Sequence, residues 1–355
     1  MSDIYLRPTG FVDAPFGFDG QVARLAGGMV WFSAVEMLSR DRPARLVPVA
    51  DMPPLLKEDA ALAVCWRRLT EARPALELGP RTLRFDQPQV MGIVNATPDS
   101  FSDGGRHGDA EGAAQAAFDM AAAGAALVDL GGESTRPGAE TLWEDDEIAR
   151  VAPVLERLRE SGILMSIDTR KSAVMRAALA RGARIVNDVS GLTHDGESLR
   201  TVADAGAPVV IMHNVGDPKT MQDAPRYDHV LLDVYDWLEG RIAAAVAGGI
   251  DPARIIADPG IGFGKTVRHN LELLNGLSLF HGLGVPVLLG ASRKGFIGAL
   301  SGEAGADARL GGSLAAVQTG LAQGVQLFRV HDVPETVQAV RVWRGLRDAA
   351  LSPAH

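Results

Sequence analysis

The sequence predicts an α/β protein whose main domain is a (β/α)8 barrel of the TIM type, with an N-terminal extension or small subdomain in front of it. From Gln89 onward, short aliphatic runs alternate with helical segments, as in parallel strands joined by crossover helices. There are eight such runs, and residues 90–349 approach the length of roughly 250 residues that one barrel needs. The alternative is a doubly wound sheet, which is open, so its first and last strands would not need to pair with each other.

The first 88 residues differ from the rest of the chain. They are rich in proline, carry Trp31, Phe32 and Trp66, and have no repeated strand and helix pattern. We expect an appended subdomain with an apolar patch that packs on the main body and has a structural role. The domains are therefore predicted as 1–88, 89–349 for the barrel and 350–355 for a tail.

The predicted strands are short runs of β-branched or aliphatic residues. They are Val90–Val94, Leu127–Leu130, Leu164–Ile167, Arg184–Val186, Val209–Met212, Ile255–Ala257, Val287–Leu289 and Leu327–Val330. Ala-rich or charged helical stretches lie between them. These are Ala110–Ala123, Asp145–Glu160, Ser172–Arg181, Tyr227–Ala247, Val267–Phe280 and Ala308–Ala322.

Composition excludes several classes of protein. The net charge of -9 argues against a nucleic-acid partner, which needs a basic surface. The single cysteine, Cys65, excludes an internal disulfide and a multi-cysteine metal site. Because the sequence has no signal-like start and no long apolar segment, we expect a cytoplasmic protein with no membrane partner.

Polar residues stand at the carboxyl ends of nearly all predicted strands, the edge that carries the active site in this kind of barrel. Asn95 ends the first strand and suits a metal or phosphate oxygen. Gly131 and Gly132 allow close backbone approach in a second loop, whose hydroxyls and Arg136 suit an anion. Asp168 and Asn187 suit a flat heterocycle with N–H donors, although each could instead cap a helix.

Two later segments add to this edge. Residues 258–266 contain three glycines but fail the phosphate-loop spacing, because Pro259 stands where that loop needs glycine. Arg293 and Lys294 follow the seventh strand in a chain with only five lysines. Arg329 and His331 lie two residues apart on one side of the eighth strand, so we expect an anion site here.

Eight ordered motifs together resemble the dihydropteroate synthase family. They are MGIVNATPDSFSDGG, GGESTRPGA, SIDTRK, NDVSG, MHN, DPGIGFGK, SRKG and RVHDV, and the resemblance covers residues 90–349. It implies a transferase of folate biosynthesis that joins (7,8-dihydropterin-6-yl)methyl diphosphate to 4-aminobenzoate and releases diphosphate, with Mg²⁺ as cofactor. It also implies a homodimer that forms through the barrel helices and a target of sulfonamides.

The resemblance further implies roles for individual residues. Asn95 would bind the metal and the diphosphate, together with Arg329 and His331. Catalytic positions would fall on Asp129, Asp168 and Lys294. The remaining substrate-binding positions would be Phe101, Thr135, Arg136, Pro137, Asn187, Asp258, Phe263 and Arg293.

Two positions depart from the family pattern. Ala96 stands where valine is common, and Gly295 stands where many members carry serine or arginine, so we expect Gly295 to affect 4-aminobenzoate binding. Alternative functions are a pterin-binding methyltransferase and a catalytically silent pterin-binding protein. The segments that would hold a diphosphate argue against the first, and the intact polar positions argue against the second.

Overall fold

The computed structural model describes residues 4–96, 105–133, 141–216, 221 and 224–352. Eight parallel strands form one sheet in the order β12-β11-β10-β9-β8-β7-β14-β13, and a bridge between Ala257 and Val287 joins its two ends. This closure confirms the predicted barrel and excludes a doubly wound sheet. The strands are β7 (Gln89–Asn95), β8 (Leu127–Gly131), β9 (Met165–Asp168), β10 (Ile185–Asp188), β11 (Val209–Met212), β12 (Ile255–Asp258), β13 (Leu288–Leu289) and β14 (Leu327–Val330).

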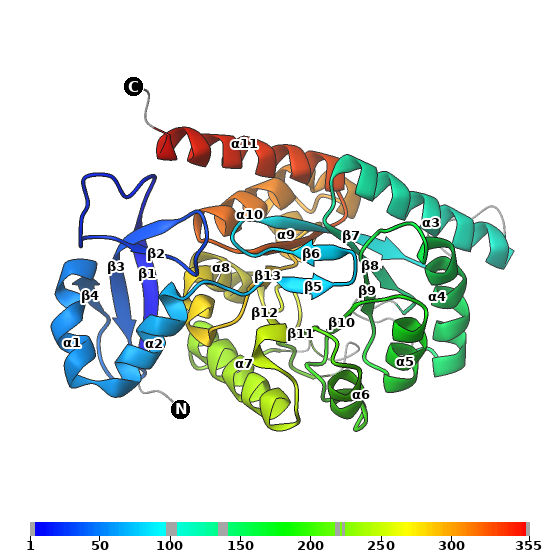
Figure 1. Ribbon diagram of the computed structural model, residues 1–355, viewed down its shortest axis with the longest axis horizontal. Helices are drawn as coiled ribbons and strands as arrows, with labels where there is room; N and C mark the ends of the chain where they lie inside the picture. Colours follow the sequence, from blue (N-terminus) through cyan, green and yellow to red (C-terminus); the bar gives the residue numbers. More distant parts are fainter. Residues whose placement is uncertain (1–3, 97–104, 134–140, 217–220, 222–223, 353–355) are drawn as a thin grey trace.

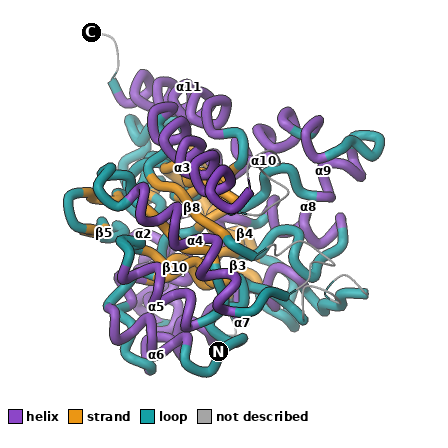
Figure 2. The backbone as a smooth tube through the Cα atoms, turned by 90° about the vertical axis from the view of Figure 1, so that its right-hand side faces the viewer, coloured by secondary structure: helices purple, strands orange, loops and turns teal. Residues whose placement is uncertain are grey.

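Helices surround the strands (Figures 1 and 2). They are α3 (Gly105–Ala123), α4 (Glu144–Leu158), α5 (Ser172–Ala180), α6 (Ser198–Ala205), α7 (Val230–Ala247), α8 (Val267–Asn275), α9 (Gly295–Leu300), α10 (Leu310–Ala322) and α11 (Val333–Leu351), with 3-10 turns η3 (Pro252–Arg254), η4 (Leu277–Leu283) and η5 (Ala306–Ala308). The predicted helix 267–280 is divided at Gly276, whose N–H bonds to the carbonyls of Glu272 and Leu273 and ends α8. Helices α6, α9 and α11 are not among the segments predicted from the sequence.

The lower end of the barrel is filled by one apolar side chain from each strand or its approach. These residues are Met91, Leu127, Leu164, Ile185, Val210, Ile256, Leu288 and Leu327. A hairpin of β5 (Leu76–Leu78) and β6 (Arg81–Leu83) packs on them with Leu76, Leu78, Leu83 and Phe85. The hairpin therefore covers this end of the barrel, opposite to the carboxyl ends of the strands.

Residues 4–70 form a separate unit with its own core, at one side of the barrel (Figure 1). Its antiparallel sheet contains β1 (Tyr5–Val12), β2 (Ala23–Arg24), β3 (Trp31–Leu38) and β4 (Arg45–Pro48). The turn η1 (Val49–Asp51) and helices α1 (Met52–Glu58) and α2 (Ala60–Thr70) complete it, and Cys65 is buried there. The segment 1–88 thus contains this unit and the hairpin of the barrel.

Polar contacts attach the unit to the barrel. Arg40 forms ion pairs with Asp233 (2.7 Å) and Asp236 (2.6 Å) of α7, and the Tyr5 hydroxyl also donates to Asp236 (2.8 Å). Arg68 pairs with Glu239, one turn further along α7 (2.7 Å). The expectation that this segment packs on the main body is therefore confirmed. No helix in the described part of the chain is long and apolar enough to cross a membrane.

Candidate active site

Two residues beyond the apolar layer, five strands place polar side chains inside the barrel. Side chains two residues apart on a strand lie on the same face, so these polar side chains point into the barrel, as those of the apolar layer do. They are Asp129, Ser166, Asn187, Asp258 and Arg329. All but Arg329 are buried, so the floor of the open end is a polar surface enclosed by the barrel wall.

Arg329 of β14 is the centre of this floor. Its Nε donates to Asp129 Oδ2 (2.6 Å) and its Nη2 donates to Asp168 Oδ2 (2.6 Å). Asn187 Nδ2 donates to the same oxygen of Asp129 (2.8 Å). Side chains from β8, β9, β10 and β14 therefore form one charged network, as predicted for the strand ends.

Two carboxylate oxygens in the network have no partner. Asp129 Oδ1 and Asp168 Oδ1 are buried and accept no hydrogen bond from any described residue. Buried acceptors are nearly always paired, so these two atoms can receive N–H donors from a ligand. Burial raises the pKa of Asp168 to about 7, Arg329 opposes that rise, and the negative charges of Asp129 and Glu147 add to it.

Asp258 of β12 lies on the opposite side of the same floor. Its Oδ1 accepts a hydrogen bond from the N–H of Gly260 (2.7 Å), and a side-chain carbon placed on Gly290 would lie 3.7 Å from its Oδ2. Burial raises the pKa of Asp258, while this N–H and the positive Lys294 oppose the rise. Glycine at position 290 therefore leaves open space beside the carboxylate.

An apolar wall rises from this side of the site. Phe263, Val189, Met212 and Met221 form one buried cluster. The ammonium of Lys294 lies 4.0 Å from the centroid of the Phe263 ring, within cation–π distance. A flat ring could therefore contact hydrocarbon on one edge and a positive charge on another.

Asn95 and His331 lie at the rim. A side-chain carbon on Gly131 would be 3.9 Å from Asn95 Oδ1 and 3.8 Å from Asp168 Oδ2, so glycine keeps the space between these two oxygens open. His331 Nδ1 lies 3.1 Å from the hydroxyl of Ser292. Burial and the nearby Arg329 lower the pKa of His331 to about 4, so at neutral pH this side chain offers hydrogen bonds rather than charge.

The structure places Arg293 differently from the rest of the predicted set. Its guanidinium is bound by Asp332 (2.5 and 3.1 Å) and by Asp307 (2.8 Å). Its backbone lies in the left-handed region with φ 58°. The charge expected near the arylamine is thus already neutralised by carboxylates. Phe101, Thr135, Arg136 and Pro137 lie outside the described residues.

A buried cluster of charged side chains was not predicted from the sequence. Lys171 pairs with Glu147 (2.5 Å) and Glu133 (3.2 Å), and Arg170 pairs with Glu133 (3.3 Å). Glu133 Oε1 also accepts from the N–H of Leu142 (2.9 Å). The available signal was the adjacency of Arg170 and Lys171 to Asp168 in SIDTRK.

A second missed group is the pair Lys265 and His213, which lie under the wall (Lys265 Nζ to His213 Nδ1, 2.9 Å). The presence of only five lysines in the chain was a signal for Lys265 as well as for Lys294.

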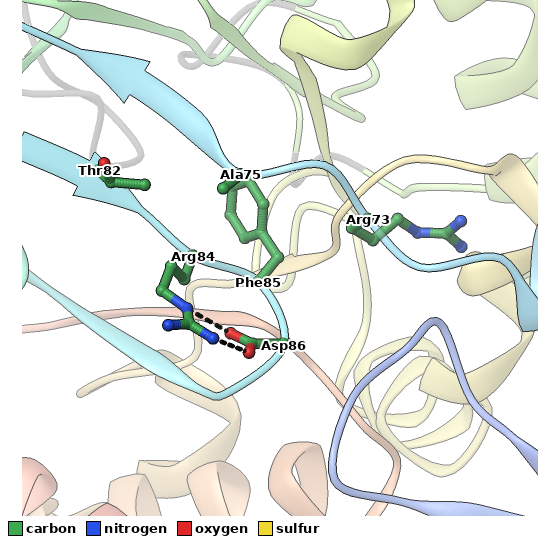
Figure 3. Close-up of a pocket in the computed structure, with 6 residues that line it drawn as sticks. All are labelled: Arg73, Ala75, Thr82, Arg84, Phe85 and Asp86. Atoms are coloured by element: carbon green, nitrogen blue, oxygen red, sulfur yellow. Dashed lines mark hydrogen bonds and ion pairs between the residues drawn. The ribbon is translucent and has the colours of Figure 1, made fainter.

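A cavity with a volume of about 380 Å³ lies at the hairpin end of the barrel, away from this site (Figure 3). Arg84 and Asp86, which line it, form an ion pair with each other. Arg73 also lines the cavity, but its guanidinium points away from that pair and donates to the carbonyls of Arg68 (2.6 Å) and His281 (2.7 Å). The charged side chains that line the cavity are therefore already paired or hydrogen bonded within the protein.

A closed barrel with a polar floor, unpaired carboxylate oxygens and an aromatic wall defines an enzyme that holds a flat, N–H-rich ring. Residues 91–331 match the family model described as pterin binding enzyme. The dihydropteroate synthase of Escherichia coli K12 is 45% identical over 262 residues, which are 74% of this chain and 92% of that protein. The chain therefore belongs to the pterin-binding enzymes and, within them, to the dihydropteroate synthases, which are transferases of folate synthesis.

Solved structures agree with this assignment. Xanthomonas albilineans dihydropteroate synthase with 4-aminobenzoic acid is 47% identical, with a TM-score of 0.73, over 78% of this chain and 99% of that one. The Yersinia pestis enzyme in a sulfonamide drug complex is 43% identical, with a TM-score of 0.74, over 78% and 100%. The alternatives of a methyltransferase and a silent binding protein gain no support from these relatives.

Proposed function

We propose that this chain condenses (7,8-dihydropterin-6-yl)methyl diphosphate with 4-aminobenzoate to give 7,8-dihydropteroate and diphosphate. The observation that carries the proposal is the polar floor, where two buried carboxylate oxygens accept no hydrogen bond from the described residues and a cationic and aromatic wall stands on the same side of the barrel as Asp258. In the reaction, the amine nitrogen forms a bond to the pterin methylene carbon. The carbon–oxygen bond to diphosphate breaks, and the nitrogen loses one proton.

The pterin would be held by the floor. Asp258, Asp129 and Asn187 offer oxygens to the N–H groups of the ring, and burial makes such hydrogen bonds stronger than in water. As the carbon–oxygen bond weakens, positive charge grows on the methylene carbon. The carboxylates of Asp129 and Asp168 would stabilise that charge because their positions are already fixed by Arg329.

The diphosphate would lie at the rim. Arg329, whose Nε and Nη2 bind the two aspartates, would contact the diphosphate through its guanidinium. His331, which is neutral near pH 7, would donate a hydrogen bond, and Asn95 would contact an oxygen of the leaving group. The site needs no covalent intermediate, because 4-aminobenzoate supplies its own nucleophile. Phe101, Thr135, Arg136 and Pro137 remain part of the proposed substrate contacts, as does Phe263 beside the arylamine.

Mg²⁺ is part of the proposal, with Asn95 as its protein ligand. Magnesium favours a few protein oxygens together with substrate phosphates and water. The amide oxygen of Asn95 would be one such ligand, because it borders the space that Gly131 leaves open beside Asp168 Oδ2. When bound, the ion would neutralise charge on the leaving diphosphate.

Three further properties belong to the same proposal. Sulfonamides should compete with 4-aminobenzoate, as the resemblance implies. A homodimer would form through barrel helices, and Val342 and Leu346 of α11, one turn apart and both exposed, support such a face. Sedimentation of the purified protein measures that association. The cytoplasmic location predicted from the sequence is tested by cell fractionation.

The function is tested by an amine-dependent assay. Purified protein with Mg²⁺ and the pterin diphosphate should release diphosphate only when 4-aminobenzoate is present. Lys294→Ala and Asp258→Ala should each lower kcat/KM at least a hundredfold, because each removes a charge from the site. Lys57→Ala, which changes an exposed lysine of α1, is the control and should keep full activity. Diphosphate release at the same rate without the amine would contradict the assignment.

A further inference from the structure

Lys265 carries a buried ammonium group directly beneath the wall of the site. The residue is only 3% exposed, and its Nζ makes three polar contacts. It lies 2.9 Å from His213 Nδ1, and it donates to the carbonyls of Gly260 (2.8 Å) and Phe263 (2.9 Å). An ammonium has three donors, so this geometry uses all of them.

The partners of this ammonium are unusual for a buried charge. None of the three is a carboxylate, and burial lowers the pKa of Lys265 to about 7, with Asp258 opposing and Lys294 adding to that effect. Burial and the positive charge of Lys265 hold the pKa of His213 well below its usual range, so the imidazole is neutral and can accept. Because burying a charge opposes folding, the placement implies a role that an apolar side chain could not fill.

The backbone conformation of residues 260–262, next to Lys265 Nζ, requires glycine at two positions. Gly260 has φ 68°, and a side-chain carbon there would lie 1.9 Å from the carbonyl oxygen of His213. Gly262 has φ 85°, and a side-chain carbon there would lie 2.9 Å from Lys294 Cδ. The chain therefore folds tightly between β11 and Lys294, and the ammonium holds its carbonyls from inside.

This segment carries the groups that face the substrates. The N–H of Gly260 bonds to Asp258, and the Phe263 ring contacts the ammonium of Lys294. The contacts of Lys265 are with the carbonyls of these same two residues, Gly260 and Phe263. A shift of either carbonyl would move the aromatic wall or the carboxylate.

We propose that Lys265, held by His213, is a positioning residue that sets the Phe263 wall and through it Lys294, without touching either substrate. The inference rests on the proposed function and deepens it. Lys265 is enclosed, so it acts on the reaction without meeting a substrate, and the Phe263 carbonyl is one of the two carbonyls that it holds. Removing the ammonium should therefore matter less when the Phe263 ring is absent.

The test is a double-mutant cycle between Lys265→Met and Phe263→Leu, with kcat/KM for the pterin diphosphate as the readout. In the otherwise unchanged protein, Lys265→Met should lower kcat/KM about tenfold. In the Phe263→Leu background, the same change should lower it less than threefold. Equal factors in the two backgrounds would overturn the proposal.

The control for a general loss of stability is His281→Asn. His281 is fully buried and hydrogen bonded, but it lies in η4, away from the site. This variant should lower the melting temperature and leave kcat/KM unchanged in the folded protein. If it lowers kcat/KM as much as Lys265→Met does, the positioning role is overturned.

A second variant covers the case in which Lys265→Met does not fold. His213→Leu removes one of the three contacts of Nζ and should couple to Phe263→Leu in the same direction with a smaller factor. Additive effects for this pair would also overturn the proposal. The unchanged protein must first show amine-dependent diphosphate release, so failure of the proposed function is seen separately from failure of the inference.

Discussion

At the scale of single residues, the site is governed by charges placed against each other inside the barrel. Arg329 binds Asp129 and Asp168 at 2.6 Å each, so it fixes two carboxylates that would otherwise repel. Each carboxylate still has one oxygen that accepts no hydrogen bond from the part of the chain that the structure describes. A partly buried arginine between two half-satisfied carboxylates thus gives a rigid site that retains acceptors for a ligand.

Gly295 is the residue where this chain departs from the family pattern in the proposed 4-aminobenzoate region. It is the first residue of α9, and a side-chain carbon there would meet no atom within 4 Å. Gly295→Ser should therefore fit and lower the KM for 4-aminobenzoate about three- to tenfold, since one added hydrogen bond contributes about 1 kcal/mol. Gly295→Ala fills the same space without the hydroxyl and is the matched control. An unchanged KM for the serine variant would contradict this role.

At the scale of elements, the strands of the barrel separate stability from chemistry along their length. The apolar layer and the β5–β6 hairpin fill the lower end, and the polar floor begins two residues above. The conformation of the loop after β12 depends on Lys265, which holds two of its carbonyls and contacts His213 after β11. Changes at the hairpin end should therefore affect folding, and changes at the loop end should affect catalysis.

The hairpin provides a direct test of this separation. Phe85 is 2% exposed and packs in the lower apolar layer, so Phe85→Ala should lower the free energy of unfolding by about 3 kcal/mol or more. Urea unfolding measures that loss, and both KM values of the folded variant should remain unchanged. Arg84→Ala, at an exposed ion pair beside it, should leave the free energy of unfolding almost unchanged. A change in either KM for Phe85→Ala would show that the two ends are coupled.

At the scale of the whole molecule, the protein contains several histidines that are buried in the neutral form. Burial lowers the pKa of His281 to about 3 and that of His331 to about 4, and it lowers the pKa of His213 as well. The unfolded chain takes up protons on these side chains as the pH falls below 6.5, and the native protein does not until the lower values are reached. Acid should therefore destabilise the fold through this window, by about 1.4 kcal/mol per pH unit for each histidine.

His281 allows this effect to be isolated. Its native pKa of about 3 means that its contribution to stability is present above pH 6.5 and is lost as the pH falls toward 3. His281→Asn should be less stable at pH 7, but its loss of unfolding free energy between pH 6.5 and 4.5 should be smaller by about 2 kcal/mol. Urea titrations at each pH measure both slopes. Asp168, whose raised pKa acts in the opposite direction, is present in both proteins and cancels; parallel slopes would contradict the prediction.

Much of the fold and of the site follows from local patterns in the sequence. The alternation of apolar runs and helices predicts the barrel, and all eight strands lie within a few residues of their predicted bounds. Asp129, Asp168 and Asn187 are predicted together because carboxyl ends of parallel strands meet at one edge. The structure joins the two aspartates through Arg329, and Asn187 donates to Asp129. These predictions need only periodicity and chain direction.

The three-dimensional structure alone decides which charges meet. Arg293 pairs with Asp332 and Asp307, Lys265 contacts His213, and Lys171 pairs with two glutamates. Local sequence patterns also could not predict the fold of residues 4–70 or its attachment to α7. Periodicity sets which face of an element a side chain occupies, but its partner is set by the closure of the barrel, because these pairs lie far apart in the sequence and their energies depend on burial that only the assembled chain provides.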